Sequence, residues 1–337
     1  MNDLRRATRA DVARLAQVSE TVVSYVLNEN RYVRQDKRER VLKAVEELNY
    51  QPNPVARTLK GKRSDHIAFI ADQIDNEHFG KIIEEMDRQA YDSGLIISLC
   101  ATRNDDRFVA QMLGRRFDGI VISSISLSEQ HIAQFVQAGL PVVVLMNRDY
   151  DALPSQAGRI YTGLYEGARA CVRHLHQECG RSRILYIDRF SAHGNYSSMQ
   201  DLRYRGFVHQ MRESGLPLSE SNIITGCRSE EEVVETIVQR IQSGFCADAL
   251  FGRNDRLAAL GALALRELKK EIPKDVSLIG FDNSTLSRYV TPPLTTMEID
   301  RPLIAQAAIQ MLQELIEGRK VLDRHFETRL IRRGSTI

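Results

Sequence analysis

Hydrophobic positions in the first fifty residues repeat at helical spacing in three short stretches. Thr8 is suited to cap the first stretch, with Asp11 three residues later as its partner, and Ser19 is suited to cap the second. Only two residues separate these helices, and a third pattern covers 35–48. Three helices with so tight a connection predict a helix-turn-helix headpiece over residues 1–50. The expected core positions are Val12, Leu15, Ala16, Val22, Val23, Val26, Leu27, Val41, Leu42, Val45 and Leu48.

Residues 51–64 have the composition of a hinge and linker. Asn53 is a good N-cap and Pro54 a good first helical residue, so a helix of about six residues follows. Helices shorter than about 12 residues are marginal alone. We therefore expect this segment to be coil by itself and helical when docked.

From residue 66 onwards, apolar runs alternate with amphipathic stretches. This alternation is typical of parallel sheets covered by helices on both faces. The repeated units fit either one barrel or two doubly wound lobes, and spacing alone leaves both open. The expected strands are 66–71, 95–101, 119–124, 141–146, 184–188, 222–225, 247–251 and 276–281, and the expected helices are 79–93, 105–115, 129–138, 163–178, 201–214, 229–243 and 254–269.

Charge divides the chain into two parts. The whole sequence of 337 residues has a net charge of +2. Residues 1–63 hold 14 Lys and Arg against 8 Asp and Glu, a net charge of +6, and the rest holds 32 against 36, a net charge of −4. Such asymmetry favours a polyanionic partner for the first part only.

Composition excludes several classes of protein. No apolar run approaches the roughly 20 residues that span a bilayer, and the first residues lack a secretory signal, so we expect a cytoplasmic protein. Five scattered cysteines form no C-x-x-C pair, which favours reduced, mostly buried thiols over disulfides or structural zinc. Gly-rich nucleotide loops and a G-x-S-x-G nucleophile motif are also missing, so neither an enzyme nor a cofactor or metal is expected.

One long motif carries a resemblance to a known family. It covers residues 8–59 without a gap and includes Asp11-Val12-Ala13-x-Leu15-Ala16-x-Val18-Ser19 and Tyr50-x-Pro52-Asn53-x-x-Ala56-Arg57-x-Leu59. Asn254-Asp255, Ile279-Gly280-Phe281-Asp282 and Pro292-Pro293-Leu294-Thr295-Thr296 extend it. The chain closely resembles the lactose-repressor/galactose-repressor family of bacterial transcription regulators.

The resemblance implies an α/β body of two doubly wound lobes, like a type I periplasmic binding protein, over 65–337. Lobe one is expected at 65–161 plus 296–323, and lobe two at 162–292 plus 326–337. It also implies a DNA-binding regulator, most often a repressor. One headpiece reads one half-site, so a homodimer on a pseudo-palindromic operator is expected. Because the sequence stops at Ile337 without a heptad extension, a dimer is favoured over a tetramer.

The same resemblance predicts DNA contacts in the headpiece and hinge. Glu20 can accept from a cytosine amino group and Thr21 can pack on a thymine methyl. Leu59 is expected to wedge into the minor groove, and Leu59→Ala to lower operator affinity at least tenfold. Val22 and Tyr25 depart from the residues common in the family, so the operator sequence stays open. The expected DNA-binding residues are Thr8, Ser19, Glu20, Thr21, Ser24, Tyr25, Asn28, Tyr32, Asn53, Val55, Ala56 and Leu59.

A cleft between the lobes is expected to bind a small effector. Most of its residues follow strands, where open α/β sheets bind ligands. Amides, a carboxylate and an arginine beside an aromatic ring suit a polyhydroxylated ligand, so a sugar or sugar derivative is expected. Gln73 and Asn147 stand where the family usually has aspartate, and His78 replaces an aromatic residue. The expected effector-binding residues are Gln73, Asn76, Phe79, Asn147, Arg203, Asn254 and Asp282.

Several alternatives stay open at this point. Each polar residue at a strand end can instead be a simple cap, since Asn and Asp favour such positions. The regulator can respond to a protein partner or to a non-sugar metabolite, and the body alone would suit a sugar-binding transport component. Whether the effector releases or strengthens DNA binding is not written in the sequence.

Overall fold

The computed structural model describes residues 7–29, 31–51, 63–91, 93–192 and 194–336. The chain divides into two units, Met1–Ser64 and Asp65–Ile337. The hinge residues Asn53, Val55, Ala56 and Leu59 lie outside the described residues, so their predicted DNA contacts stay predictions.

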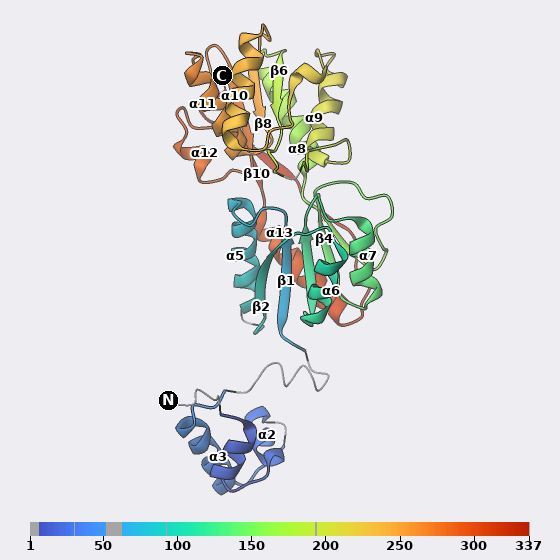
Figure 1. The fold of residues 1–337 in the computed structure, drawn as a ribbon, viewed down its shortest axis with the longest axis vertical. Helices are drawn as coiled ribbons and strands as arrows, with labels where there is room; N and C mark the ends of the chain where they lie inside the picture. Colours follow the sequence, from blue (N-terminus) through green and yellow to red (C-terminus); the bar gives the residue numbers. More distant parts are fainter. Residues whose placement is uncertain (1–6, 30, 52–62, 92, 193, 337) are drawn as a thin grey trace. The chain divides into compact units, whose positions relative to one another are not determined.

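In the described part of the first unit, the helices α1 (Arg9–Leu15), α2 (Glu20–Asn28) and α3 (Gln35–Glu47) pack as a bundle (Figure 1). Both predicted N-caps are confirmed. The Asp11 amide donates to Thr8 Oγ1 at 3.3 Å, and the Thr8 amide donates back to the Asp11 carboxylate at 2.9 Å. The Ser19 hydroxyl accepts from the Val22 amide at 3.4 Å. These side chains satisfy amides that the first turn of a helix otherwise leaves unpaired.

The headpiece core is narrower than the sequence predicted. Leu15 and Leu42 are 44% and 46% exposed, so their assignment to the core was wrong. Successive residues of a helix are rotated by about 100° around its axis. Around this axis, Leu15 lies on the opposite side of Val12 from the buried Ala13 and Ala16, and Leu42 lies on the opposite side of Val41 from the buried Ala44. The smaller Ala13 and Ala44 are buried instead. The buried residues are Val12, Ala13, Ala16, Val23, Val26, Val41, Ala44 and Tyr50.

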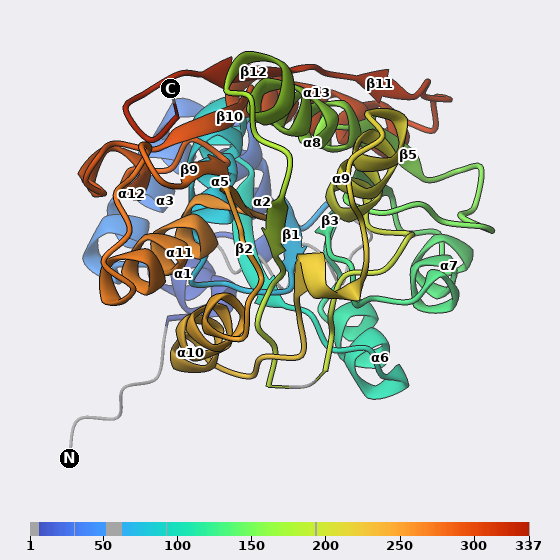
Figure 2. The ribbon, with the colours of Figure 1, turned by 90° about the horizontal axis from the view of Figure 1, so that it is seen from above.

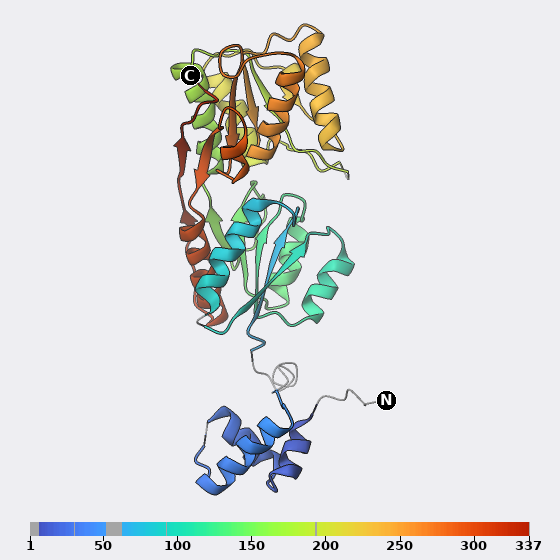
Figure 3. The same cartoon turned by 90° about the vertical axis from the view of Figure 1, so that its left-hand side faces the viewer.

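The second unit contains two six-stranded sheets, each the centre of a lobe (Figures 1 and 3). Lobe one has the strand order β11-β5-β4-β3-β1-β2, with all neighbours parallel. Helices α5 and α13 pack against each other, as do α6 and α7. The elements are β1 (His66–Ala71), α5 (Glu77–Tyr91), β2 (Ile96–Ala101), α6 (Asp106–Gly114), β3 (Gly119–Ser123), α7 (Glu129–Gln137), β4 (Val142–Met146), β5 (Gly158–Tyr161), α13 (Arg301–Ile316) and β11 (Arg324–His325).

Lobe two repeats this arrangement with the order β12-β10-β9-β8-β6-β7, in which only β12 is antiparallel to its neighbour. Helices α8 and α9 pack together, and so do α10 and α11 (Figure 2). The elements are α8 (Leu164–Arg173), a π-helical turn (His174–Glu178), β6 (Ile184–Ile187), α9 (Leu202–Glu213), a 3-10 turn (Glu220–Asn222), β7 (Ile223–Ile224), α10 (Glu230–Gln242), β8 (Ala249–Gly252), α11 (Asp255–Glu267), β9 (Ser277–Phe281), α12 (Leu286–Tyr289), β10 (Thr295–Ile299) and β12 (Thr328–Ile331).

The eight strands and seven helices predicted for the body are present, with ends shifted by about two residues at most. The exception is the helix predicted at 163–178, which divides into α8 and the π-helical turn. The body forms two lobes and not a barrel, the two architectures between which the spacing of the elements could not decide. The structure differs at the lobe boundaries, because 296–299 belongs to β10 of lobe two and 324–325 to β11 of lobe one. Strand β10 pairs with β9 from Thr295 to Met297, and this pairing keeps it in lobe two.

The described residues contain no helix that is both long and apolar enough to cross a membrane. All five cysteines lie among the described residues, and none of them forms a disulfide. Only Cys171 and Cys227 are buried, and Cys246 is exposed, so the expectation of mostly buried thiols was too broad.

Candidate functional site

Helix α2 of the headpiece presents a polar face away from its core. Val23 and Val26 are buried, whereas Glu20 and Thr21 are exposed at the start of the helix. An exposed helix start with free polar side chains is the part of a helix-turn-helix unit that reaches base edges. The predicted reading residues that the structure describes are Thr8, Ser19, Glu20, Thr21, Ser24, Tyr25, Asn28 and Tyr32.

Some of these side chains already make hydrogen bonds within the headpiece, and others are exposed. The hydroxyls of Thr8 and Ser19 cap helices. The Asn28 amide donates back to the Ser24 carbonyl at 2.6 Å, whereas Tyr32 is 91% exposed. Sequence reasoning missed Arg31, whose guanidinium carbon lies 5.3 Å from the centre of the Tyr25 ring. An exposed cation three residues after the end of α2 was the signal that could have found it.

In the second unit, one cavity lies between the two lobes. All seven predicted effector residues contribute to its wall, and four of them lie within two residues of the ends of the strands β1, β4, β8 and β9. Parallel strands end at the same edge of a sheet, which brings these positions together. Their role in binding stays a prediction. Sequence reasoning noted His78 only as a departure from the family and missed the rest of the wall. The other residues of the wall are Asp72, His78, Ile125, Leu164, Arg189, Phe190, Arg253, Arg256 and Leu257.

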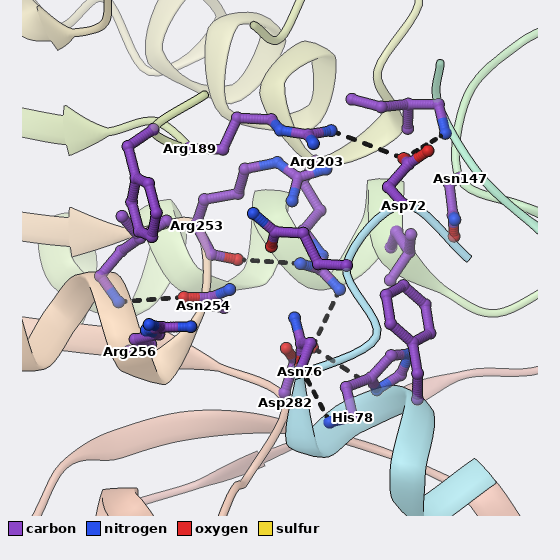
Figure 4. A pocket seen from close by; sticks show the side chains of 16 residues that line it. Asp72, Asn76, His78, Asn147, Arg189, Arg203, Arg253, Asn254, Arg256 and Asp282 are labelled. Atoms are coloured by element: carbon purple, nitrogen blue, oxygen red, sulfur yellow. Dashed lines mark hydrogen bonds and ion pairs between the residues drawn. The ribbon is translucent and has the colours of Figure 1, made fainter. Parts of the chain in front are cut away.

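Arg203 and Asp282 form a buried ion pair at the base of the cavity (Figure 4). Arg203 Nη2 donates to Asp282 Oδ1 at 2.9 Å, and its guanidinium carbon lies 4.5 Å from the centre of the Phe281 ring. Burial opposes ionisation of Asp282, but the Arg203 guanidinium holds its pKa below the usual range. The backbone of Asp282 has φ of +98°, a conformation that a non-glycine residue rarely adopts. The strain and the ion pair both fix the direction of this carboxylate.

Gly206 allows Arg203 to reach this position. A Cβ atom at residue 206 would collide with the Tyr165 carbonyl oxygen on α8. The missing side chain therefore allows α9 to pack closely on α8. The glycine three residues after Arg203 thus has a structural reason.

A second buried ion pair, Arg253 with Asp201, lies beside the first. Arg253 Nη2 donates to Asp201 Oδ2 at 2.6 Å. Asp201 also caps α9, since it accepts from the amides of Arg203 at 3.0 Å and Tyr204 at 3.2 Å. Burial opposes the charge of Arg253, but the Asp201 carboxylate raises the pKa of Arg253 overall. Both ion pairs belong entirely to lobe two.

On the lobe one side, Asp72 is held by the loop after β3. The Ser124 hydroxyl donates to Oδ1 at 2.5 Å and the Ile125 amide to Oδ2 at 2.8 Å, and the Ser126 hydroxyl also donates. Nearby, the Asn147 amide donates to Ser123 Oγ at 3.0 Å. Lobe one therefore supplies an oriented carboxylate and amides where lobe two supplies guanidinium groups.

Several polar contacts join the lobes across the cavity. Arg189 Nη1 lies 3.6 Å from Asp72, and Arg256 Nη1 lies 3.1 Å from Asp75. The Thr285 amide donates to the Glu77 carboxylate at 2.8 Å. These contacts leave a cavity of about 60 Å³. Pockets for small molecules usually measure about 300–1,000 Å³, so a whole effector requires these side chains to separate.

His78 lies between the lobes and is uncharged. Its Nδ1 is 3.9 Å from the Asp282 carboxylate, a distance too long for a hydrogen bond. Burial lowers the pKa of His78 to about 3, although the Asp282 charge acts in the opposite direction. A neutral imidazole can accept or donate one hydrogen bond to a ligand.

Comparison with family models supports both units. Residues 8–53 match the model described as bacterial regulatory proteins, lacI family, and residues 172–336 match the periplasmic binding protein-like domain. An HTH-type transcriptional repressor PurR from Vibrio vulnificus is 32% identical over 327 residues, which cover 95% of each chain.

Solved structures show the same fold. The lac repressor dimer bound to operator and the anti-inducer ONPF has a TM-score of 0.83 at 24% identity, covering 99% of this chain and all of the other. The complex of the transcriptional regulator CelR with cellobiose has a TM-score of 0.70 at 23% identity, covering 98% of this chain and all of the other.

Proposed function

This chain belongs to the lacI family of bacterial regulatory proteins, and we propose that it represses transcription as a cytoplasmic homodimer under the control of a small molecule. As a family member it is a DNA-binding transcriptional repressor and not an enzyme. Its operator is pseudo-palindromic, because two-fold related headpieces read two half-sites of the same sequence.

The exposed polar start of α2 is the observation that carries this proposal. Ser19 and the helix N-terminus contact a phosphate, which positions the helix without reading sequence. Glu20 and Thr21 read base edges in the major groove. Tyr25 and Arg31 lie further along the chain than Glu20 and Thr21, and they contact a base or the DNA backbone. The net charge of +6 on residues 1–63 draws the headpiece to DNA.

The cleft between the lobes is the proposed effector site. All seven predicted residues border one cavity, and polar groups from both lobes face it. Because a whole effector requires the lobes to separate from the closed arrangement seen here, binding changes the arrangement of the lobes. DNA affinity then shifts by the same factor by which DNA shifts effector affinity. A sugar or sugar derivative remains the proposed class of effector, supported by the hydrogen-bonding side chains of the wall.

The first experiment tests DNA reading. The full chain selects its own operator from random-sequence DNA, and fluorescence anisotropy then measures affinity for it. We expect the selected operator to be a pseudo-palindrome. We expect Glu20→Ala to weaken binding about tenfold, which is about 1.4 kcal/mol and lies within the range of about 1–3 kcal/mol for a lost base contact. Glu47→Ala, the same change at an exposed position on α3, is the matched control and retains full affinity. Equal affinities for both variants, or an affinity that barely falls with salt, would contradict the proposal.

The second experiment tests control by a small molecule. A thermal-shift screen of sugars and nucleobases is followed by operator binding with and without each hit. A compound that stabilises the protein and changes operator affinity supports the proposal. Should no small molecule shift either quantity, the cleft is not an effector site.

A further inference from the structure

Three arginines of lobe two converge on the cavity (Figure 4). Arg189 follows β6, Arg203 lies in the first turn of α9, and Arg253 follows β8. The Nε atom of each is buried without a hydrogen-bond partner. Buried polar groups in folded proteins are nearly always paired, so three such nitrogens at one cavity require an explanation.

Arg189 is the least satisfied of the three. Arg203 and Arg253 each donate to a buried carboxylate at hydrogen-bond distance, as described above. Within the described residues, the Arg189 guanidinium makes no hydrogen bond, and its charge partner is Asp72 at 3.6 Å. Its side chain is only 12% exposed. Burial lowers the pKa of Arg189, and the nearby Arg253 charge lowers it further.

The carboxylates around these arginines are already engaged elsewhere. Asp72 accepts from three groups of the loop after β3, and Asp188 accepts from the Ser197 amide at 3.0 Å and the Thr225 hydroxyl at 3.1 Å. The oxygens of Asn76 and Asn254 accept from backbone amides at 2.9 Å. The wall is therefore rich in unused donors, and a ligand rich in acceptors matches it.

We propose that the effector carries a phosphate or carboxylate group, which binds to the Arg189 guanidinium beside Arg253 and Arg203. Guanidinium groups pair with both anions through two parallel hydrogen bonds. The cavity of about 60 Å³ has room for one small group of this kind but not for a whole effector. This inference rests on the proposed use of the cleft and specifies the chemistry of the molecule that enters it.

The anion replaces Asp72 as the partner of Arg189. Asp72 keeps its three donors from lobe one when it loses Arg189, so the exchange leaves no carboxylate unpaired. The exchange also removes one of the contacts between the lobes. Binding of the anionic group is thereby coupled to lobe arrangement.

The test measures binding to the full chain by calorimetry in a chloride buffer of fixed ionic strength. Inorganic phosphate and acetate probe the anionic group alone. Glucose 6-phosphate and gluconate, each compared with glucose, distinguish a phosphate ester from a carboxylate. The variants are Arg189→Gln, Asp72→Asn and, as the matched control, Arg212→Gln, which changes an exposed arginine near the end of α9.

We expect at least one anion to bind to the wild type. The same anion should bind to Arg189→Gln at least tenfold more weakly and to Arg212→Gln with wild-type affinity. Asp72→Asn should bind it several-fold more tightly, because the competing carboxylate has lost its charge. If Arg189→Gln does not fold, the direction of the Asp72→Asn effect decides. Failure of every anion to bind, equal losses in Arg189→Gln and Arg212→Gln, or unchanged or weaker binding to Asp72→Asn overturns the inference.

Operator binding separates this inference from the proposed function. A neutral sugar or nucleobase that binds in the cleft as tightly as its charged counterpart, and changes operator affinity, keeps effector control but overturns the anionic group. An anion that binds through Arg189 without changing operator affinity keeps the anionic site but overturns effector control.

Discussion

The two lobes share one topology but face their common cavity with different chemistry. The strand order is equivalent in both, β2-β1-β3-β4-β5 in lobe one and β7-β6-β8-β9-β10 in lobe two. Lobe one ends its strands with a carboxylate and amides, Asp72 and Asn147 among them. Lobe two places Arg189 and Arg253 after its strands β6 and β8, and the carboxylate that follows β9, Asp282, is already paired with Arg203. The fold thus determines where polar residues meet, and the sequence determines what they can bind.

The lobes also differ in how their charges are paired. The ion pairs Arg203–Asp282 and Arg253–Asp201 are internal to lobe two, so its side of the cavity is organised whether or not lobe one is near. Asp72 and Asp75 of lobe one meet their arginines only across the cavity. Opening the lobes therefore separates the Asp72 and Asp75 pairs and leaves the internal pairs intact. Breaking an internal pair should cost stability, whereas breaking a pair across the cavity should mainly change lobe arrangement.

The largest effect is expected from Asp201→Ala. This change leaves Arg253 buried without its carboxylate and removes the cap of α9. Removing one partner of a buried ion pair costs about 3–5 kcal/mol of unfolding free energy. Urea denaturation measures it, with Asp87→Ala on the exposed face of α5 as the control, expected within about 0.5 kcal/mol of wild type. A loss below about 1 kcal/mol would mean that lobe two does not depend on its internal pairs.

A pH response is expected from the buried Asp255 of lobe two. Burial raises its pKa to about 7, although the Thr296 hydroxyl and the Ser284 amide donate to it. The folded state then binds a proton more tightly than the unfolded chain, whose Asp has a pKa near 3.9. The protonated carboxyl group therefore contributes its full stability below about pH 4, and this contribution is lost as the pH rises to about 7. Over this range the free energy of unfolding falls by up to about 1.4 kcal/mol per pH unit.

Two variants test this assignment. Asp255→Asn removes the titrating group, so its unfolding free energy relative to wild type should rise steadily between pH 4 and pH 7. Thr296→Val removes a hydrogen bond that lowers the pKa of Asp255, so the window should extend to higher pH. Leu263→Ala, a half-exposed position on the same helix, should keep the wild-type pH profile. An Asp255→Asn variant with the wild-type profile would place the pH response elsewhere.

The sequence predicted where polar side chains lie in this fold better than it predicted which side chains they contact. Caps such as Ser19 depend on neighbours within one turn, and residues after parallel strands such as Asn254 must share an edge, so both were predictable. Arg189 and Arg253 were missed because an arginine after a strand is an ordinary exposed residue by local pattern. Their burial depends on Asp72 and Asp201, which lie far away in sequence.

Sequence reasoning also missed elements in which apolar and polar residues follow no clear periodic pattern. Strand β10 begins with Thr295 and Thr296, both fully buried. Their polarity hid the strand, because the hydroxyls are satisfied only by distant groups, the Arg333 carbonyl and the Asp255 carboxylate. Helix α13 is buried on more than one side, so it has no single apolar stripe to detect.

The smallest effect is expected from the outermost pair between the lobes, Asp75–Arg256. Its side chains are 67% and 43% exposed, and Arg256 also pairs with Glu230 of its own lobe. Exposed pairs contribute about 0.2–1 kcal/mol and are screened by salt. A double-mutant cycle of Asp75→Asn and Arg256→Gln, read by thermal unfolding, should therefore give a coupling below about 1 kcal/mol that vanishes at high salt. A coupling above about 2 kcal/mol would mean that exposed pairs hold the lobes together, and the difference drawn between internal and cross-cavity pairs would fail.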